Sequence, residues 1–258
     1  MIQSYIAMGD SFTEGLGDWL GEDQPRGWAD LVAEALALDA KDKGSTSPFE
    51  YANLAIRGRR LQPLIDEQLD GAIEQGPDLV SINGGGNDML RPGFLLEESV
   101  DALLSAVNKI ADSGIHVLLL AGPDPSENLP FGHVFNERGG EFTDRMVELV
   151  PSSDMVTVVD NFHDEGFHNS TYWSEDGLHL STAGHIRCAA NCLDGLGVAY
   201  PRWWGDPRDP EPDPKNYQSV HYLREYVAPW IGRRLTGRSS GDGRTAKRPV
   251  LSPFDAGH

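Results

Sequence analysis

The sequence predicts an α/β fold, a three-layer α/β/α sandwich whose central sheet has five parallel strands. Short apolar runs of strand length alternate along the chain with longer segments in which apolar residues recur at helical spacing. This alternation favours parallel pairing through right-handed crossovers, with helices on both faces of the sheet. The 258 residues can bury a substantial core, and they fit one such domain with additions better than two equal domains.

The elements are expected in strict alternation along the first three quarters of the chain. The predicted strands cover residues 2–8, 50–54, 78–83, 115–120 and 155–159. Apolar residues at helical spacing predict helices over residues 28–38, 61–73, 97–112, 135–150 and 183–196. Ser181 or Thr182 is placed to cap the last of these helices.

The composition changes after Gly197, which divides the expected α/β domain, residues 1–197, from the rest of the chain. Five prolines between residues 200 and 214 predict an extended linker over residues 198–218. Helical spacing returns over residues 219–236, where Pro229 should kink or end the helix. Residues 237–258 form a basic tail that is expected to be disordered. Such a tail can fold back on the acidic body, bind a partner or be solvated, and the solvated state is favoured.

Charge and cysteine content limit the class of protein. The chain has 40 acidic and 21 basic residues, a net charge of -19, which argues against nucleic acid or an anionic membrane as its main partner. No apolar run approaches the length of a membrane span, and no signal sequence is recognised, so a cytoplasmic protein is expected. Cys188 and Cys192 lie four residues apart in a predicted helix, where buried reduced thiols are expected.

The first predicted strand breaks directly into Gly9-Asp10-Ser11. Ser11 therefore lies at the carboxyl end of a strand, and this edge of an open α/β sheet is where ligands bind. Ser11 is a candidate nucleophile if other segments supply a base and an oxyanion site. In the alternative interpretation, Asp10 and Ser11 only cap a helix.

Other polar positions follow later strands or precede a helix on the same side of the sheet. They are Gly58, Asn87 after three consecutive glycines, and the pair Asp176 and His179. Because all parallel strands end at one edge, these positions are expected to meet Ser11 there. Each has an ordinary alternative, as a helix-start glycine, a turn residue or a surface histidine. It is less expected that all four positions have these ordinary explanations and still occur in this order than that any single one does.

The order Gly9-Asp10-Ser11, Gly58, Gly86-Asn87-Asp88 and Asp176-Gly177-Leu178-His179 resembles that of the GDSL/SGNH hydrolase family. The resemblance covers residues 2–196, and Phe12 stands where the family name has a leucine. It implies the flavodoxin-like SGNH hydrolase fold and the activity of a serine ester hydrolase that needs no cofactor.

The resemblance also implies a role for each matched residue. Ser11 would be the nucleophile and His179 its general base, with Asp176 orienting the imidazole. The backbone N–H groups of Ser11 and Gly58 and the side-chain amide of Asn87 would form the oxyanion hole.

Two rival assignments involve other histidines. His185 is the obvious alternative base, but the family spacing favours His179. The second rival is a metal site, and its candidate ligands are His163, His168, His179, His185, Asp160, Asp164 and Asp176. Their spacing matches no zinc signature, so no metal is expected.

The substrate is expected to be a small-molecule ester. Loops rich in glycine and polar residues suggest a small, partly polar site that favours short acyl groups, including acetyl groups on sugars. A carbohydrate O-acetylesterase, a lysophospholipase and a thioesterase are alternatives. So is a non-catalytic binding protein that retains the fold, although its catalytic set should be broken and this one is intact.

Candidate substrate-pocket residues are Asp10 and Asp88, beside the key positions, and the loop aromatics Tyr172 and Trp173. The two aspartates are expected to be turn or hydrogen-bonding groups rather than catalytic acids. The acyl pocket is expected in the loops 122–132 and 160–176. The oligomeric state does not follow from the sequence.

Overall fold

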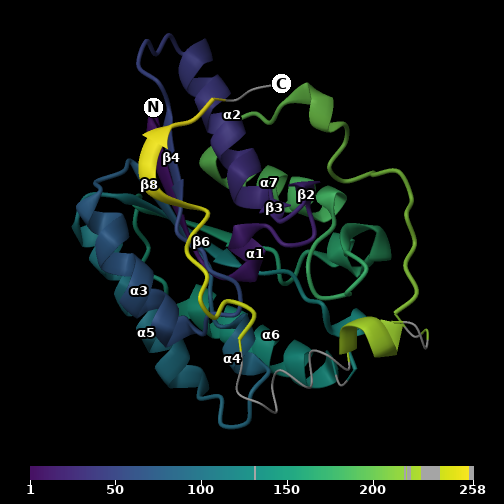
Figure 1. Cartoon of the computed structure of the whole chain (residues 1–258). Helices are drawn as coiled ribbons and strands as arrows, with labels where there is room; N and C mark the ends of the chain where they lie inside the picture. The colour runs from purple at the N-terminus through teal and green to yellow at the C-terminus, as the bar shows by residue number, and fades with distance from the viewer. Residues whose placement is uncertain (131, 218, 220–221, 228–238, 256–258) are drawn as a thin grey trace.

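A computed structural model describes residues 1–130, 132–217, 219, 222–227 and 239–255. Its centre is a sheet with the strand order β7-β6-β5-β1-β4-β8 (Figure 1). The strands are β1 (Ser4–Met8), β4 (Glu50–Asn53), β5 (Leu79–Ile82), β6 (His116–Ala121), β7 (Val156–Asp160) and β8 (Arg248–Pro253). The first five are parallel, as predicted, and β8 adds a sixth, antiparallel strand beside β4.

Strand β1 shows how the sheet separates two hydrophobic cores. Tyr5 and Ala7 contribute to the core on one face, whereas Ile6 and Met8 contribute to the core on the other. All four are fully buried, because successive side chains of a strand point to opposite faces and helices cover both. A strand buried on both sides is apolar throughout, which is why the sequence shows a continuous apolar run here.

In the described part of the chain, five long helices form the two outer layers, which Figure 1 shows on either side of the sheet. The first core lies under α2 (Trp28–Asp42) and α7 (Thr182–Leu196), and the second under α3 (Leu61–Glu74), α5 (Leu96–Asp112) and α6 (Gly132–Leu149). Ser181 caps α7, since its Oγ accepts a hydrogen bond from Gly184 N. The buried Cys188 and Cys192 are free thiols on this helix.

The carboxyl edge of the sheet carries several short elements. Two of them are one-turn helices that directly follow strands, α1 (Ser11–Glu14) after β1 and α4 (Gly86–Met89) after β5. A small hairpin pairs β2 (Trp19–Gly21) with β3 (Gln24–Pro25). The 3-10 helices η1 (Ser126–Asn128), η2 (Glu165–His168) and η3 (Ser170–Tyr172) follow β6 and β7.

The structure corrects the expectation that the whole tail is disordered. Residues 248–253 form β8, in which Pro253 pairs with Glu50 and Ser252 with Tyr51 of β4. Without β8, β4 would be an edge strand with unpaired backbone groups, and β8 forms hydrogen bonds with these groups. Residues 248–253 are therefore a strand because of their partner β4, and not because of a pattern in their own sequence. Within the predicted helix 219–236, Leu223–Val227 forms a π-helical turn, and residues 228–236 lie outside the described part. Between α7 and that turn, η4 (Arg202–Trp204) is a 3-10 helix in the proline-rich segment.

Candidate active site

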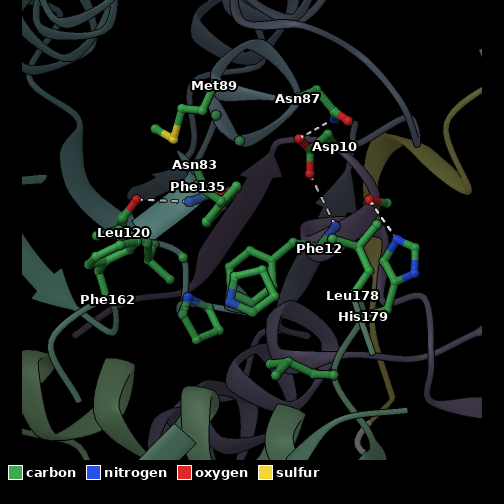
Figure 2. Close-up of a pocket in the computed structure, with 18 of the residues that line it drawn as sticks. Asp10, Phe12, Asn83, Asn87, Met89, Leu120, Phe135, Phe162, Leu178 and His179 are labelled. Carbon is green, nitrogen blue, oxygen red and sulfur yellow. Dashed lines mark hydrogen bonds between the residues drawn. The ribbon is translucent and has the colours of Figure 1, made fainter. Parts of the chain in front are cut away.

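Ser11 is the first residue of α1, directly after β1. Asp10 caps this helix, because its Oδ1 accepts a hydrogen bond from Phe12 N at 3.1 Å. The Ser11 side chain instead points to His179, with 3.0 Å between Ser11 Oγ and His179 Nε2 (Figure 2). The helix cap is therefore formed by Asp10, and the Ser11 hydroxyl lies within hydrogen-bond distance of His179 instead.

The loop before α7 holds His179 in one orientation. Its Nδ1 lies 2.5 Å from Asp176 Oδ2, while Asp176 Oδ1 accepts hydrogen bonds from the backbone N–H groups of Leu178 and His179 at 3.0 and 2.9 Å. The Ser174 hydroxyl also donates to Asp176 Oδ1, at 2.7 Å. Since a carboxylate can only accept, Nδ1 carries the proton and Nε2 is free to accept the proton of Ser11.

The electrostatics of the pair support the same assignment. Burial alone would raise the pKa of Asp176, but the His179 charge and three hydrogen bonds from residues 178 and 179 outweigh it and hold that pKa below its usual value. Burial likewise lowers the pKa of His179, and the neighbouring Asp176 carboxylate more than compensates, so the pKa of His179 is raised. The aspartate therefore stabilises the imidazolium that forms when the histidine takes a proton.

The candidate oxyanion groups follow three strands: Ser11 begins α1 after β1, Gly58 lies in the turn after β4, and Asn87 lies in α4 after β5. Gly58 has a φ of +74°, a left-handed conformation in which an L side chain would be strained. Among the described residues, none accepts a hydrogen bond from the N–H of Ser11 or of Gly58. The amide of Asn87 is occupied, because its Nδ2 donates to Asp10 Oδ2 at 2.9 Å and to Arg59 O at 3.0 Å. The N–H groups of Ser11 and Gly58 are therefore available to an oxyanion, whereas Asn87 Nδ2 would first have to give up one of its two hydrogen bonds.

Asp10 and Asp88 have the hydrogen-bonding roles that were expected. Asp10 is buried beside the site, and burial raises its pKa to about 6, against the opposing effect of its hydrogen bonds from Phe12 and Asn87. Asp88 Oδ2 accepts a hydrogen bond from Leu61 N at 2.9 Å, which ties the β5 loop to the start of α3. Asp10 lines the cavity at Ser11, and Asp88 does not.

A cavity of about 110 Å³ opens beside Ser11 and His179. Its apolar wall includes Met89, Leu120, Phe135, Phe142, Phe162 and Leu178. In Figure 2 the polar groups Asp10, Asn87 and His179 gather at one side of the view, and Met89, Phe135 and Phe162 at the other. The site is thus more apolar than the glycine-rich and polar loops suggested.

The two loops in which the acyl pocket was expected, residues 122–132 and 160–176, supply only part of this wall. Pro123 and Pro125 come from the first loop, and Phe162 and Trp173 from the second. Helix α6 was not among the segments expected to line the site, yet its Phe135 and Phe142 lie seven residues apart and both line the cavity. Helical spacing was the available signal, but an aromatic stripe on a helix is ordinarily read as core.

Tyr172 and Trp173 have different positions. Trp173 lines the cavity, and its Nε1 donates a hydrogen bond to Phe167 O at 2.6 Å. Tyr172 lies in the core, where its hydroxyl donates to Pro207 O at 3.1 Å and accepts from Arg187 Nη1 at 3.2 Å. Adjacent residues leaving a 3-10 turn point in different directions, so the structure corrects the expected substrate contact of Tyr172.

His185 is a buried structural residue. Its Nδ1 accepts a hydrogen bond from Trp28 N at 3.1 Å, and its Nε2 lies 3.0 Å from Leu16 O. Burial lowers its pKa to about 4, so it is neutral at neutral pH with both ring nitrogens engaged. It has no free nitrogen with which to serve as the base for Ser11.

The other residues of the rival metal site are dispersed. His163 Nδ1 lies 2.7 Å from Asp160 Oδ2, His168 lies 3.9 Å from a Glu127 oxygen, and Asp164 is paired with Arg187. In the part of the chain that the structure describes, no three His, Cys, Asp or Glu side chains form a group that could hold a metal ion. Nor does any helix in that part have the length and apolar character needed to cross a membrane.

Comparison with known proteins places the chain in a family. The sequence model of the GDSL-like Lipase/Acylhydrolase family matches residues 7–187. A comparison with curated protein sequences finds no match. Among solved structures, the lipase Lip_vut3 from a goat rumen metagenome is 20% identical, with a TM-score of 0.59, and the match covers 77% of this chain and 98% of that one.

Two further solved structures have the same fold. The psychrotrophic esterase EstA from Pseudoalteromonas sp., inhibited by monoethylphosphonate, is 20% identical with a TM-score of 0.56, and the match covers 79% of this chain and all of that one. The acetylxylan esterase Axe2 from Geobacillus stearothermophilus is 20% identical with a TM-score of 0.58, covering 76% of this chain and 95% of that one.

Proposed function

Because the chain belongs to the GDSL-like lipase/acylhydrolase family, we propose that it is a serine ester hydrolase that forms an acyl-enzyme on Ser11. The observation that carries the proposal is the continuous hydrogen-bonded path from Ser11 Oγ through His179 to Asp176, which ends beside an apolar cavity. A nucleophile, a base and a group that orients the base are the parts that acyl transfer requires.

The reaction follows from this geometry. Ser11 Oγ attacks the ester carbonyl carbon while its proton passes to His179 Nε2, and the carbonyl oxygen becomes an oxyanion. When this tetrahedral intermediate collapses, the bond to the alcohol oxygen breaks and His179 returns the proton to the leaving alcohol. Water then attacks the acyl-enzyme by the same steps, releasing the acid and regenerating the Ser11 hydroxyl.

The oxyanion would bind first to the N–H groups of Ser11 and Gly58. Asn87 can join them only by giving up one of its two hydrogen bonds, to Asp10 or to Arg59 O. The exchange is favourable where the oxyanion carries more charge than the acceptor it replaces, which holds for the neutral carbonyl of Arg59. Asn87 would then contribute in the transition state more than in the ground state, as catalysis requires.

The lining of the cavity indicates the acyl group. The aromatic and aliphatic side chains of the cavity come from α4, α6 and the loops after β6 and β7. They present more apolar surface than the methyl group of an acetyl ester can cover, and this surface matches an aliphatic or aromatic acyl chain. In place of the short acyl groups expected from the loops, we therefore propose an ester with an apolar acyl part of intermediate length. A carbohydrate O-acetylesterase is less well supported by this wall than a lysophospholipase or thioesterase.

The direct test is hydrolysis of p-nitrophenyl esters from acetate to palmitate by the wild type, Ser11→Ala and His179→Ala. We expect the wild-type rate to peak between butyrate and decanoate, and both variants to lose activity by at least about three orders of magnitude. Circular dichroism verifies that the variants are folded. Activity that survives in folded Ser11→Ala would overturn the mechanism.

Labelling separates an inactive protein from an unsuitable substrate. A fluorophosphonate probe should modify Ser11 in the wild type and leave Ser11→Ala unlabelled. A wild type that neither hydrolyses an ester nor reacts with the probe would support the alternative of a non-catalytic binding protein.

A further inference from the structure

Residues 239–255, here named the C-terminal strap, run from the site edge of the sheet to the outer side of β4 (Figure 1). The strap lies beyond residues 7–187, which the family model matches. Its contacts with the core domain are therefore an addition to the matched fold. They begin beside the candidate oxyanion loop and end in β8.

The far end of the strap is anchored to the sheet edge. Besides the β8–β4 pairing, Arg248 Nε donates a hydrogen bond to Tyr51 O at 2.8 Å. The Phe254 ring packs edge-on against Tyr51, with 5.2 Å between ring centroids, and Phe254 N donates to Phe49 O at 2.8 Å. This end therefore has a defined place relative to β1 and the loops that follow it.

The middle of the strap holds the helix that carries the nucleophile. Lys247 Nζ donates to Glu14 O at 2.6 Å, to Pro25 O at 3.1 Å and to Asp30 Oδ2 at 2.6 Å. An ammonium group has three hydrogens, so all of its donors are used. Glu14 is the last residue of α1, whose first residue is Ser11. Lys247 thus connects α1 to strand β3 of the hairpin and to α2.

The near end of the strap lies against the candidate oxyanion loop. Ser239 Oγ donates a hydrogen bond to Gly58 O at 3.3 Å, and a Cβ on Gly58 would come within 2.3 Å of this hydroxyl oxygen. Gly241 packs on Arg57 O so closely that a Cβ there would lie 2.0 Å from it. The close approach of two backbones explains why a glycine occupies position 241.

A buried ion pair joins the two contact points. The Glu14 carboxylate accepts hydrogen bonds from Arg57 N at 2.7 Å, from Arg57 Nε at 2.9 Å and from Arg57 Nη2 at 2.5 Å. Lys247 binds the backbone carbonyl of the same Glu14, and Arg57 directly precedes Gly58. The contacts therefore close a ring through α1, Glu14, Arg57, Gly58 and the strap.

We propose that the C-terminal strap fixes the nucleophile helix against the oxyanion loop, with Lys247 and Ser239 as positioning residues. The catalytic consequence rests on the proposed function, whereas the fixing of the two segments does not. Helix α1 has only four residues and cannot hold itself rigidly. Catalysis needs Ser11 and the Gly58 N–H placed to within a few tenths of an ångström, so looser segments lower kcat more than they raise KM.

The test compares Lys247→Met with the wild type and with the matched control Lys43→Met. Lys43 also loses an ion pair in this change, to Asp39, but lies on the surface at the end of α2. We expect kcat for the best p-nitrophenyl ester to fall about 10- to 100-fold in Lys247→Met, with KM within about threefold of wild type. Ser239→Ala should show a smaller fall in kcat, restored by Ser239→Thr, and Lys43→Met should be unchanged.

A second variant separates a positioning role of Lys247 from the effect of leaving Asp30 unpaired. Lys247→Met leaves the partly buried Asp30 carboxylate without its partner, so the double variant Asp30→Asn/Lys247→Met restores neutrality at that position. If the fall in kcat comes from the lost bond to Glu14 O, it persists in the double variant. A double variant with wild-type kcat would overturn Lys247 as a positioning residue.

Amide hydrogen exchange tests the fixing of the segments without an ester. Peptides covering residues 9–16 and 54–60 should exchange faster in Lys247→Met than in the wild type and Lys43→Met, while peptides from α5 stay unchanged. If the wild type neither hydrolyses an ester nor reacts with the fluorophosphonate probe, the proposed function fails, but faster exchange would still support the strap. Unchanged exchange in both peptides would overturn the strap, even in an active enzyme.

Discussion

The side-chain amide of Asn87 donates a hydrogen bond to the carboxylate of Asp10, with 2.9 Å between Asn87 Nδ2 and Asp10 Oδ2. The bond joins α4 to the residue before Ser11, the proposed nucleophile. It also places a buried carboxylate in the electrostatic field of His179, where each group stabilises the charge of the other. Asp10 therefore influences the candidate site in two ways, through its hydrogen bond from Asn87 and through its charge near His179.

Replacing Asp10 by Asn should move the pH dependence of the reaction. The negative charge of Asp10 raises the pKa of His179, so its removal lowers that pKa and leaves the histidine unprotonated at more acidic pH. The acidic limb of the kcat/KM profile should shift to lower pH in Asp10→Asn. A profile measured from pH 4.5 to 9 provides the check, and an unchanged or upward-shifted limb would contradict the coupling.

Replacing Asn87 by Ala should lower kcat by about two orders of magnitude, because an oxyanion donor is lost while the backbone donors of Ser11 and Gly58 remain. The same change leaves Asp10 with fewer hydrogen bonds and should raise its pKa further. Asn108→Ala, an exposed change on α5, is the control and should leave kcat unaltered. Wild-type kcat in Asn87→Ala would exclude Asn87 from the oxyanion hole.

Shortening Phe135 should change the preferred acyl chain. Phe135→Ala deepens the cavity beside Ser11, so the optimum among p-nitrophenyl esters should move to longer chains. The lost packing should reduce the free energy of unfolding by about 3 kcal/mol. Leu104→Ala, in a comparably buried position on α5, should lose similar stability by urea unfolding and keep the wild-type optimum. If Phe135→Ala and Leu104→Ala prefer the same acyl chain length, the acyl group does not bind against Phe135.

His185 should make stability depend on pH. Its pKa is about 4 in the folded protein and near its usual value of 6.5 when unfolded, so the unfolded state binds the extra proton first as pH falls. This contribution is present above pH 6.5 and is lost as pH falls toward 4. It amounts to about 3 kcal/mol at its largest.

Urea unfolding of the wild type and His185→Gln at pH 7.5 and pH 5 measures this linkage. His185→Gln should be the less stable protein at pH 7.5, because glutamine cannot reproduce the geometry of the two buried hydrogen bonds that the imidazole forms with Trp28 N and Leu16 O. The difference from wild type should narrow at pH 5. A difference that stays constant would show that His185 does not titrate in this range.

The local regularities of the chain were sufficient to predict most of the fold. Apolar runs such as residues 78–83 and helical spacing over residues 97–112 report on contacts each segment makes along its own length, so β5 and α5 occur where expected. The approach of Ser11, Asp176 and His179 was also predictable, because parallel strands end at one edge. The four blocks that carry the resemblance all lie within residues 7–187, which the family model matches.

The sequence alone therefore determined the five parallel strands, the helices that cover them and the residues of the candidate triad. Tertiary structure alone decided that Asn87 donates to Asp10, that Phe135 and Phe142 of the second core also line the cavity, and that the tail supplies β8 and Lys247. The physical reason is the range of the interactions involved. Periodicity along a segment identifies its buried face, whereas the partner of an edge strand, an amide or an ammonium group is set by segments far away in the chain.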